Sequence, residues 1–257
     1  MRSPLRSCLV AASLLLVVIT APGRAAEKPA KSPVLIVADE IPAMEALSKQ
    51  LEARAKTSSE IITQDKLPDS LAGYPAVLVY IHKALAEKAE NAFLDYAAAG
   101  GKLVLLHHSI SSGKRPDKNK RWLPELGVEV PTGEFAAGGY KYFDDVEWDI
   151  VNLAPKDPVT THGVTYPIKV ERAGKKLPGY HPKPTEVYLN HVLTGPRTIL
   201  LGMHYVHSDG KVFDQDTVAW VKPLGKGRVY YFMPGHRAQD FENPVYAQIL
   251  SNAVTAK

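Results

Sequence analysis

The chain has 257 residues, of which 45% are hydrophobic and 23% are charged. These values are ordinary for a folded globular protein and exclude disordered and collagen-like chains. The length suits one large domain or at most two small ones, and it is too great for a small disulfide-stapled scaffold. The formal net charge of +4 is too small for a protein that binds nucleic acid electrostatically, so we expect no nucleic-acid partner.

Residues 1–26 have the pattern of a secretory signal peptide. Arg2 and Arg6 form a short basic segment, 9–19 is an apolar run, and small residues suited to cleavage follow. The run is short for a membrane-spanning helix, and an uncleaved anchor is the alternative. We therefore expect a secreted or periplasmic protein with no stable membrane insertion once the signal is removed.

The single cysteine, Cys8, lies within this signal segment. A mature chain without it has no thiol catalysis, no disulfide and no cysteine-ligated metal. Cleavage also removes three of the 31 Lys and Arg residues, which leaves 28 bases against 27 acids and a net charge of +1. The mature protein is thus expected to be close to neutral.

Beyond a polar linker at 27–32, the first half of the chain predicts alternating strands and helices. Val34–Ala38 is a continuous apolar run, typical of a strand buried on both faces. A helix with Pro42 in its first turn follows. Further strands are expected at 61–62, 76–81 and 103–106, with a second helix that ends at Gly100 and Gly101. This alternation is the signature of an α/β fold.

The middle of the chain, 108–195, is irregular, and we interpret it as loops and hairpins inserted on the sheet. The alternative, a separate domain, lacks the apolar periodicity for its own core. Strands then return at 198–202, 218–221 and 229–232, the last two joined by a glycine-containing hairpin turn. Asn243 caps a final helix. The prediction is one domain over 33–257.

Five of the predicted strands end at a side chain that can bind a ligand or transfer a proton. These side chains are Asp39, His82, His107 with His108, His204 and His236. In open α/β sheets the ligand crevice lies outside the carboxyl ends of the parallel strands. Polar residues also follow buried strands simply because strands end at the surface. The repeated histidines nevertheless favour a site at this edge, since histidine titrates nearest physiological pH.

Three chemistries suit such a site. Histidine with a carboxylate can perform general acid–base catalysis, and the same residue types can bind a metal ion. No tight pair of metal ligands occurs in the sequence, so no metal or other cofactor is assigned. The third is nucleophilic catalysis by Ser109, which lies where a nucleophile elbow would lie but has His107 and Ser111 where that motif has glycines.

Three segments resemble the ThuA-like (trehalose utilisation) family. The segment 218–236, VAWVKPLGKGRVYYFMPGH, is similar to its C-terminal signature, and 241–250, FENPVYAQIL, to its Asn-Pro helix. The segment 97–109, AAAGGKLVLLHHS, resembles its Gly-Gly strand ending in histidine. The resemblance extends over about 33–255. The middle motifs depart from it, because Asp157 stands where the family usually has histidine and only Glu186 of an acidic pair is kept.

This resemblance implies a fold like that of the class I glutamine amidotransferases, a flavodoxin-like three-layer α/β sandwich whose sheet is mostly parallel. It also implies loss of the amidotransferase cysteine and a link to sugar catabolism, including oxidised 3-keto disaccharides or glycosides. His107 and His236 match the family's motifs, and Glu186 is a partial match.

The leading hypothesis is a secreted ThuA-like enzyme acting on a small carbohydrate by acid–base chemistry. We expect His107, His236 and Glu186 to be catalytic. We expect substrate contacts from Asp39, His108, Ser109 and His204. One alternative is a non-catalytic module that binds a sugar or a partner on the same scaffold. The other is a metal-dependent hydrolase.

Overall fold

A computed structural model describes residues 32–111 and 118–256, which belong to one compact unit, Lys31–Lys257. The predicted signal peptide and all but the last residue of the predicted linker lie outside the described residues. No helix among the described residues is long and apolar enough to cross a membrane.

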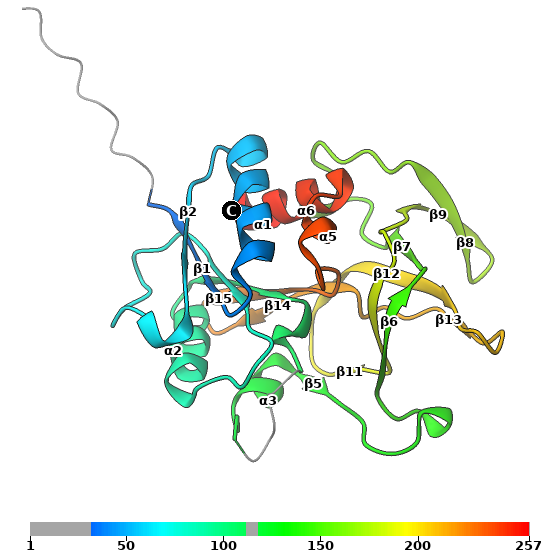
Figure 1. The fold of residues 1–257 in the computed structure, drawn as a ribbon, viewed down its shortest axis with the longest axis horizontal. Helices are drawn as coiled ribbons and strands as arrows, with labels where there is room; N and C mark the ends of the chain where they lie inside the picture. Colours follow the sequence, from blue (N-terminus) through cyan, green and yellow to red (C-terminus); the bar gives the residue numbers. More distant parts are fainter. Residues whose placement is uncertain (1–31, 112–117, 257) are drawn as a thin grey trace, which may run out of the picture. The chain divides into compact units, whose positions relative to one another are not determined.

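One large sheet runs through this unit, and its first half is parallel (Figure 1). The order of the parallel strands is β2 (Ser59–Ile62), β1 (Val34–Ala38), β3 (Val77–Tyr80), β4 (Lys102–Leu106) and β15 (Gly227–Phe232). Every residue of β1 and β3 is buried, which explains their uninterrupted apolar sequences. The α/β fold predicted from the sequence is confirmed.

The second half of the sheet is antiparallel. It continues through β14 (Ala219–Leu224), β12 (Thr198–Val206), β7 (Asp149–Asn152), β9 (Lys175–Tyr180) and β8 (Ile168–Arg172), with β13 (Val212–Phe213) paired to β12. Since β14 is antiparallel to both β12 and β15, these two strands run the same way.

The middle segment differs from the expectation of loops and hairpins placed on the sheet. β7, β8 and β9 extend the main sheet itself. β8 and the first half of β9 are only partly buried, so the sequence shows no strong core pattern there. Two small antiparallel ladders complete the region: β6 (Lys141–Val146) with β10 (Thr185–Leu189), and β5 (Val128–Glu129) with β11 (Val192–Leu193).

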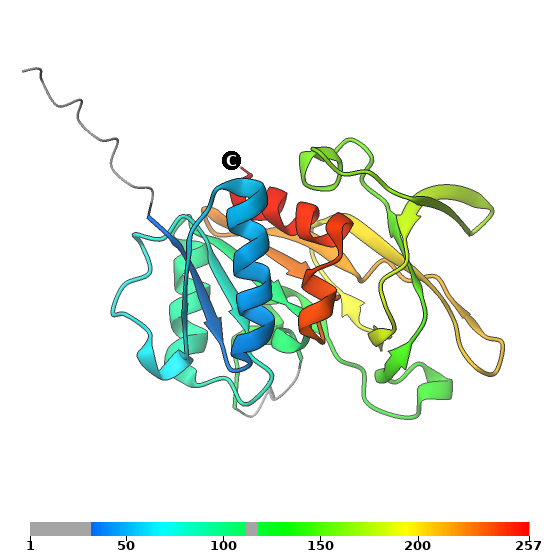
Figure 2. The same ribbon diagram turned by 45° about the horizontal axis from the view of Figure 1, so that its top comes forward.

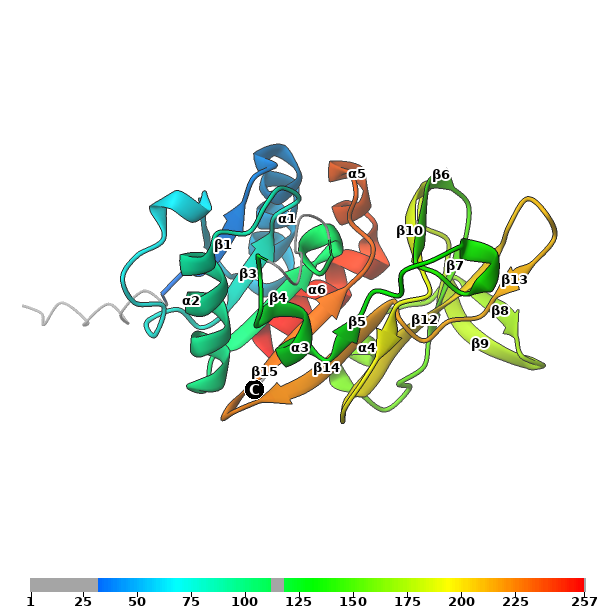
Figure 3. The same ribbon diagram turned by 90° about the horizontal axis from the view of Figure 1, so that it is seen from below.

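Helices cover both faces of the parallel half (Figures 2 and 3). On one face α1 (Ile41–Ala55) packs against α5 (Ala238–Phe241) and α6 (Pro244–Thr255), and α6 also contacts α4 (Pro158–Thr161). On the other lie α2 (Glu87–Ala98) and α3 (Trp122–Leu126). Short 3-10 turns are η1 (Gln64–Lys66), η2 (His107–Ser109) and η3 (Phe135–Ala137). Asn243 caps α6 as predicted, accepting hydrogen bonds from the amides of Val245 and Tyr246.

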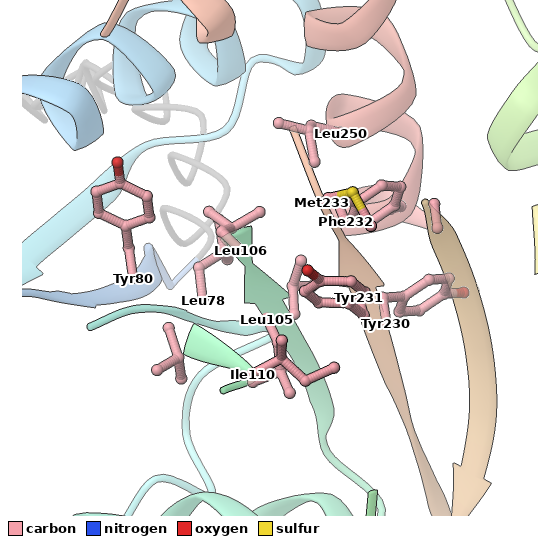
Figure 4. Close-up of a cluster of buried hydrophobic side chains, with 14 of the residues drawn as sticks. Leu78, Tyr80, Leu105, Leu106, Ile110, Tyr230, Tyr231, Phe232, Met233 and Leu250 are labelled. Atoms are coloured by element: carbon pink, nitrogen blue, oxygen red, sulfur yellow. The ribbon is translucent and has the colours of Figure 1, made fainter. Parts of the chain in front are cut away.

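The apolar core also positions the loop that follows β15. Figure 4 shows Tyr80 of β3 and Met233, directly after β15, within the buried cluster. The Tyr80 hydroxyl donates to the Gly235 carbonyl at 2.7 Å, and the Tyr246 hydroxyl donates to the Pro234 carbonyl at 2.6 Å. Two buried tyrosines therefore hold the backbone directly before His236.

The predicted hairpin between β14 and β15 also packs against the end of α2. A Cβ at Gly227 would lie 2.2 Å from the Gly101 carbonyl oxygen and 2.4 Å from the Ala97 carbonyl oxygen. Both atoms belong to the backbone and cannot move without shifting the turn that follows α2. Only glycine fits at this approach.

Gly227→Ala is therefore expected to lower the free energy of unfolding by about 1–3 kcal/mol. Gly73→Ala is the matched control, because a Cβ at Gly73 meets nothing within 4 Å; its effect should stay within about 0.5 kcal/mol. Denaturant titrations of the two variants measure the difference. Equal stability of both would contradict the steric argument.

Candidate functional site

The carboxyl ends of β1, β3, β4 and β15 lie at one edge of the sheet, because these strands are parallel. His107 is the first residue after β4, and His236 follows β15 by four residues. Strand pairing alone therefore brings together two histidines that are far apart in the sequence. The sequence-based expectation of a shared edge holds for these residues.

The ring of His107 is fixed by the backbone. The residue has φ +50°, in the left-handed region that a non-glycine residue seldom adopts, and its side chain is fully buried. Its Nδ1 lies 2.6 Å from the Met233 carbonyl oxygen, which can only accept a hydrogen bond. Nδ1 therefore carries a proton, and Nε2 faces the site.

Three polar groups surround Nε2 of His107. Oε2 of Glu186 lies at 2.9 Å, the hydroxyl of Tyr188 at 3.0 Å and Nδ1 of His236 at 3.1 Å. Glu186 also approaches His236, with 3.5 Å between Oε2 and Nδ1. We call His107, Glu186 and His236 the His–Glu–His triad.

The contacts in the triad shift the pKa values of Glu186 and His236 in opposite directions. Burial raises the pKa of Glu186, but hydrogen bonds from His107 and His236 outweigh it and hold the pKa well below its ordinary value. The hydrogen bond to Glu186 raises the pKa of His236 against the opposing effect of burial. Burial and the charge of Glu186 raise the pKa of Tyr188, which remains a neutral phenol. The geometry thus favours ionised Glu186 beside protonated His236.

Strand β10 supplies the carboxylate from outside the main sheet. Glu186 and Tyr188 are two residues apart and reach the same histidine, as period-2 side chains of a strand can. Figure 3 shows β10 beside α5. There, Oδ2 of Asp240 accepts hydrogen bonds from the Thr185 hydroxyl and the Arg237 amide, each at 2.9 Å. One buried carboxylate thereby ties β10 to the loop that carries His236.

A second group lies beside the triad. Oε1 of Glu40 is 3.1 Å from Nδ1 of His82, and its Oε2 is 3.9 Å from Nε2 of His108. The rings of His82 and His108 stack with 4.3 Å between centroids and 9° between planes. His108 in turn contacts the ring of His107, at 4.7 Å between centroids. We call Glu40, His82 and His108 the second group.

Three residues predicted to contact substrate have other structural contacts. Asp39 accepts hydrogen bonds from the amides of His82 and Lys83, at 2.9 and 2.8 Å, and so shapes the turn after β3. His204 lies within β12, which continues to Val206, and pairs with Asp214 at 2.8 Å. The predicted strand end at Gly202 was too early, because pairing with β7 and β13 prolongs β12.

Ser109 is the third of these residues. Its hydroxyl is fully buried, donates to the Val79 carbonyl at 2.7 Å and accepts from the Ile81 amide at 3.0 Å. The hydroxyl thus satisfies two backbone groups at the end of β3. This geometry contradicts the alternative of Ser109 as an exposed nucleophile.

The sequence did not single out Glu40 or Tyr188. Glu40 directly follows Asp39, and a helix-start carboxylate of that kind is common. Tyr188 is two residues beyond Glu186, so the alternation of a strand was the available signal. Using that signal requires knowing that the face of β10 that carries Glu186 and Tyr188 is directed at His107.

Ser109→Ala is expected to destabilise the fold by about 1–3 kcal/mol, because it removes the two buried hydrogen bonds that the hydroxyl makes to the Val79 carbonyl and the Ile81 amide. Ser208→Ala, at an exposed position, is the control and should change stability by less than about 0.5 kcal/mol. Thermal melting compares the two. A Ser109→Ala protein as stable as the parent would show that the hydroxyl has no structural role.

Comparison with known proteins places this arrangement in a family. The family model described as ThuA, trehalose utilisation, matches residues 34–255. A search of curated proteins found no match.

Solved structures share the fold at low sequence identity. A ThuA-like protein from Parabacteroides merdae has a TM-score of 0.60 at 15% identity, covering 88% of this chain and 91% of that one. One from Bacteroides uniformis has a TM-score of 0.59 at 18% identity, covering 88% and 92%. A β-galactosidase from Rahnella sp. R3 has a TM-score of 0.54 at 14% identity, covering 86% of this chain and 30% of that one. With a family model matched over almost all of its described length, the chain belongs to the ThuA-like (trehalose utilisation) family.

Proposed function

We propose that this ThuA-like protein is an enzyme that acts on a small carbohydrate, with the His–Glu–His triad as its catalytic centre. The observation that carries the proposal is the meeting of two imidazoles and a carboxylate within 2.9–3.5 Å at the carboxyl edge of the parallel strands. The family's description, trehalose utilisation, supports a sugar as the substrate class. The proposed substrate is an oxidised, 3-keto disaccharide or glycoside.

The three residues have different roles in this proposal. His236 is the proton donor, because its side chain is 25% exposed and can reach a ligand, while Glu186 stabilises its imidazolium form. His107 is fully buried, so it orients Glu186 and His236 through Nε2. Of the four substrate contacts that the sequence indicated, Asp39 and His204 are partly exposed and stay proposed contacts. His108 and Ser109 are buried.

A 3-keto sugar suits an acid and a base placed this close together. The keto group acidifies the neighbouring C2–H bond, and the glycosidic oxygen on C1 is the leaving group. Loss of the C2 proton to a base and protonation of that oxygen by an acid break the C1–O bond and form a C1=C2 double bond, with no external oxidant. His236 is the imidazolium available as acid. When its proton passes to the leaving oxygen, the positive charge that lowers the pKa of Glu186 is removed, so Glu186 can then accept the C2 proton.

Polar groups beside His236 are available for sugar hydroxyls. Oδ1 of Asp144, on β6, lies 3.8 Å from Nε2 of His236. Arg237 pairs with Asp144 and Asp145, at 3.4 and 2.9 Å. Carboxylate and guanidinium groups that are partly exposed can exchange these contacts for hydroxyl groups of a ligand.

His107→Ala combined with His236→Ala is expected to lower turnover of a 3-keto disaccharide by at least about 100-fold, the usual contribution of general acid–base groups. His236→Ala alone should show most of the loss, and its partly exposed position keeps the fold intact. Product formation is measured by chromatography, and thermal melting checks folding. His181→Ala is the control, because His181 is exposed and pairs with Asp149 away from the triad.

Turnover by the double variant at the parent rate would refute the catalytic assignment. Binding of keto-disaccharides in calorimetry, without any product from the parent protein, would instead favour a non-catalytic sugar-binding module. A panel of plain and oxidised disaccharides makes this comparison in one series.

We also propose export of the chain to the periplasm or the medium. The support is the sequence of residues 1–26, with its basic start, apolar run and small residues. N-terminal sequencing of the protein recovered from a producing cell is expected to begin at or next to Glu27. Recovery of an intact N-terminus from the cytoplasm would contradict export.

A further inference from the structure

The contacts at Nε2 of His107 cannot all be ordinary hydrogen bonds. Nδ1 already donates to Met233, so Nε2 has either one lone pair or one proton. It nevertheless has a carboxylate oxygen, a phenol and a second imidazole nitrogen within 3.1 Å. A single proton satisfies only one of these in good geometry. The convergence of donor atoms on one point needs another explanation.

We infer that the His–Glu–His triad binds a divalent transition-metal ion of the zinc type, through Nε2 of His107, Nδ1 of His236 and Oε2 of Glu186. These three atoms lie within 4.8 Å of one another, with separations of 2.9, 3.1 and 3.5 Å. Ligands of tetrahedral zinc, with bonds of about 2.0–2.2 Å, lie roughly 3.3–3.5 Å apart. Shifts of a few tenths of an ångström therefore open space for the ion.

The orientation of the rings supports the same site. The planes of His107 and His236 are inclined by 67°, so lone pairs on Nε2 and Nδ1 can meet at one point once the ion has displaced the proton of His236. In the second group the planes of His82 and His108 differ by only 9°. Nearly parallel stacked rings direct their lone pairs side by side, and one ring must rotate before both can bind one ion. The triad is thus the better arranged of the two.

Carbonyl and carboxylate groups also lie next to the ring nitrogens of the triad that would not bind the ion. Histidines that bind metals usually donate their other N–H to a carbonyl or carboxylate. Nδ1 of His107 donates to the Met233 carbonyl, and Nε2 of His236 faces Oδ1 of Asp144 at 3.8 Å. The hydrogen bond to Met233 therefore leaves Nε2 of His107 for the ion, and Asp144 lies on the side of the His236 ring opposite to Nδ1.

The ligand set identifies the class of metal. Two imidazoles and one carboxylate are typical of zinc, iron and related divalent ions, whereas magnesium and calcium prefer oxygen ligands throughout. Three protein ligands leave a further position on the solvent side, where His236 is 25% exposed. An oxygen of water or of a sugar is the group that fits there. The inference concerns the same site as the proposed function but does not depend on carbohydrate turnover.

The test is zinc binding to the full chain in the absence of any sugar. After treatment with a chelator and dialysis, titration with zinc chloride in a calorimeter is expected to show one ion bound at the triad. Glu186→Gln and His236→Ala should each weaken this binding at least tenfold, because each removes one of three ligands. Magnesium chloride should not compete. The visible spectrum of bound cobalt(II) gives a second readout.

Glu40→Gln and His82→Ala are the matched controls, since they make the same chemical changes in the second group. Zinc binding should persist in both. Absence of saturable binding by the parent chain would overturn the inference, as would loss of binding in the two controls with retention in Glu186→Gln. Thermal melting verifies that each variant is folded, and if Glu186→Gln is not, the partly exposed His236→Ala decides.

These experiments can refute the metal site and the proposed function independently of each other. Turnover of a 3-keto disaccharide by a chain that binds no zinc would overturn the metal site and leave the acid–base proposal intact. Zinc binding at the triad without turnover of any sugar would refute the proposed function and support the metal site.

Discussion

The contact between Glu186 and His107 is the interaction on which the rest of the site depends. A carboxylate with so little exposure is costly to bury unless it is paired, and Oε2 finds its partner 2.9 Å away on a different part of the chain. β10 is outside the main sheet and pairs with β6, and this contact joins it to the residue that follows β4. Asp240 then secures the arrangement by bonding Thr185 and the amide of Arg237.

The neighbouring backbone is organised to make that contact possible. His107 adopts a left-handed conformation at the end of a fully extended strand, and such conformations persist only where the surroundings hold them. Here the hydrogen bond to Met233 holds the ring, and Tyr80 and Tyr246 hold the loop between Met233 and His236. The rigid core thus determines the position of both imidazoles, as expected for a site built on strands.

The sequence could predict the site residues that directly follow strands of the parallel sheet. His107 and His236 follow continuous apolar runs, and buried parallel strands place such residues at one edge by geometry alone. Glu186 came from the family resemblance, and nothing local shows that β10 crosses to this edge. His204 failed as a strand-end residue because β12 is prolonged by partners, β7 and β13, that its own sequence does not reveal.

The adjacent residues His107, His108 and Ser109 make different contacts at the end of β4. The family resemblance implies loss of the amidotransferase cysteine, and this sequence has its only cysteine at position 8. Ser109 does not replace it, since its hydroxyl satisfies the backbone of β3. His108 stacks on His82, away from Glu186. His107 meets Glu186 and His236 within 3.1 Å, whereas His108 meets Glu40 only at 3.9 Å, so the proposed chemistry at this strand end depends on the imidazole of His107.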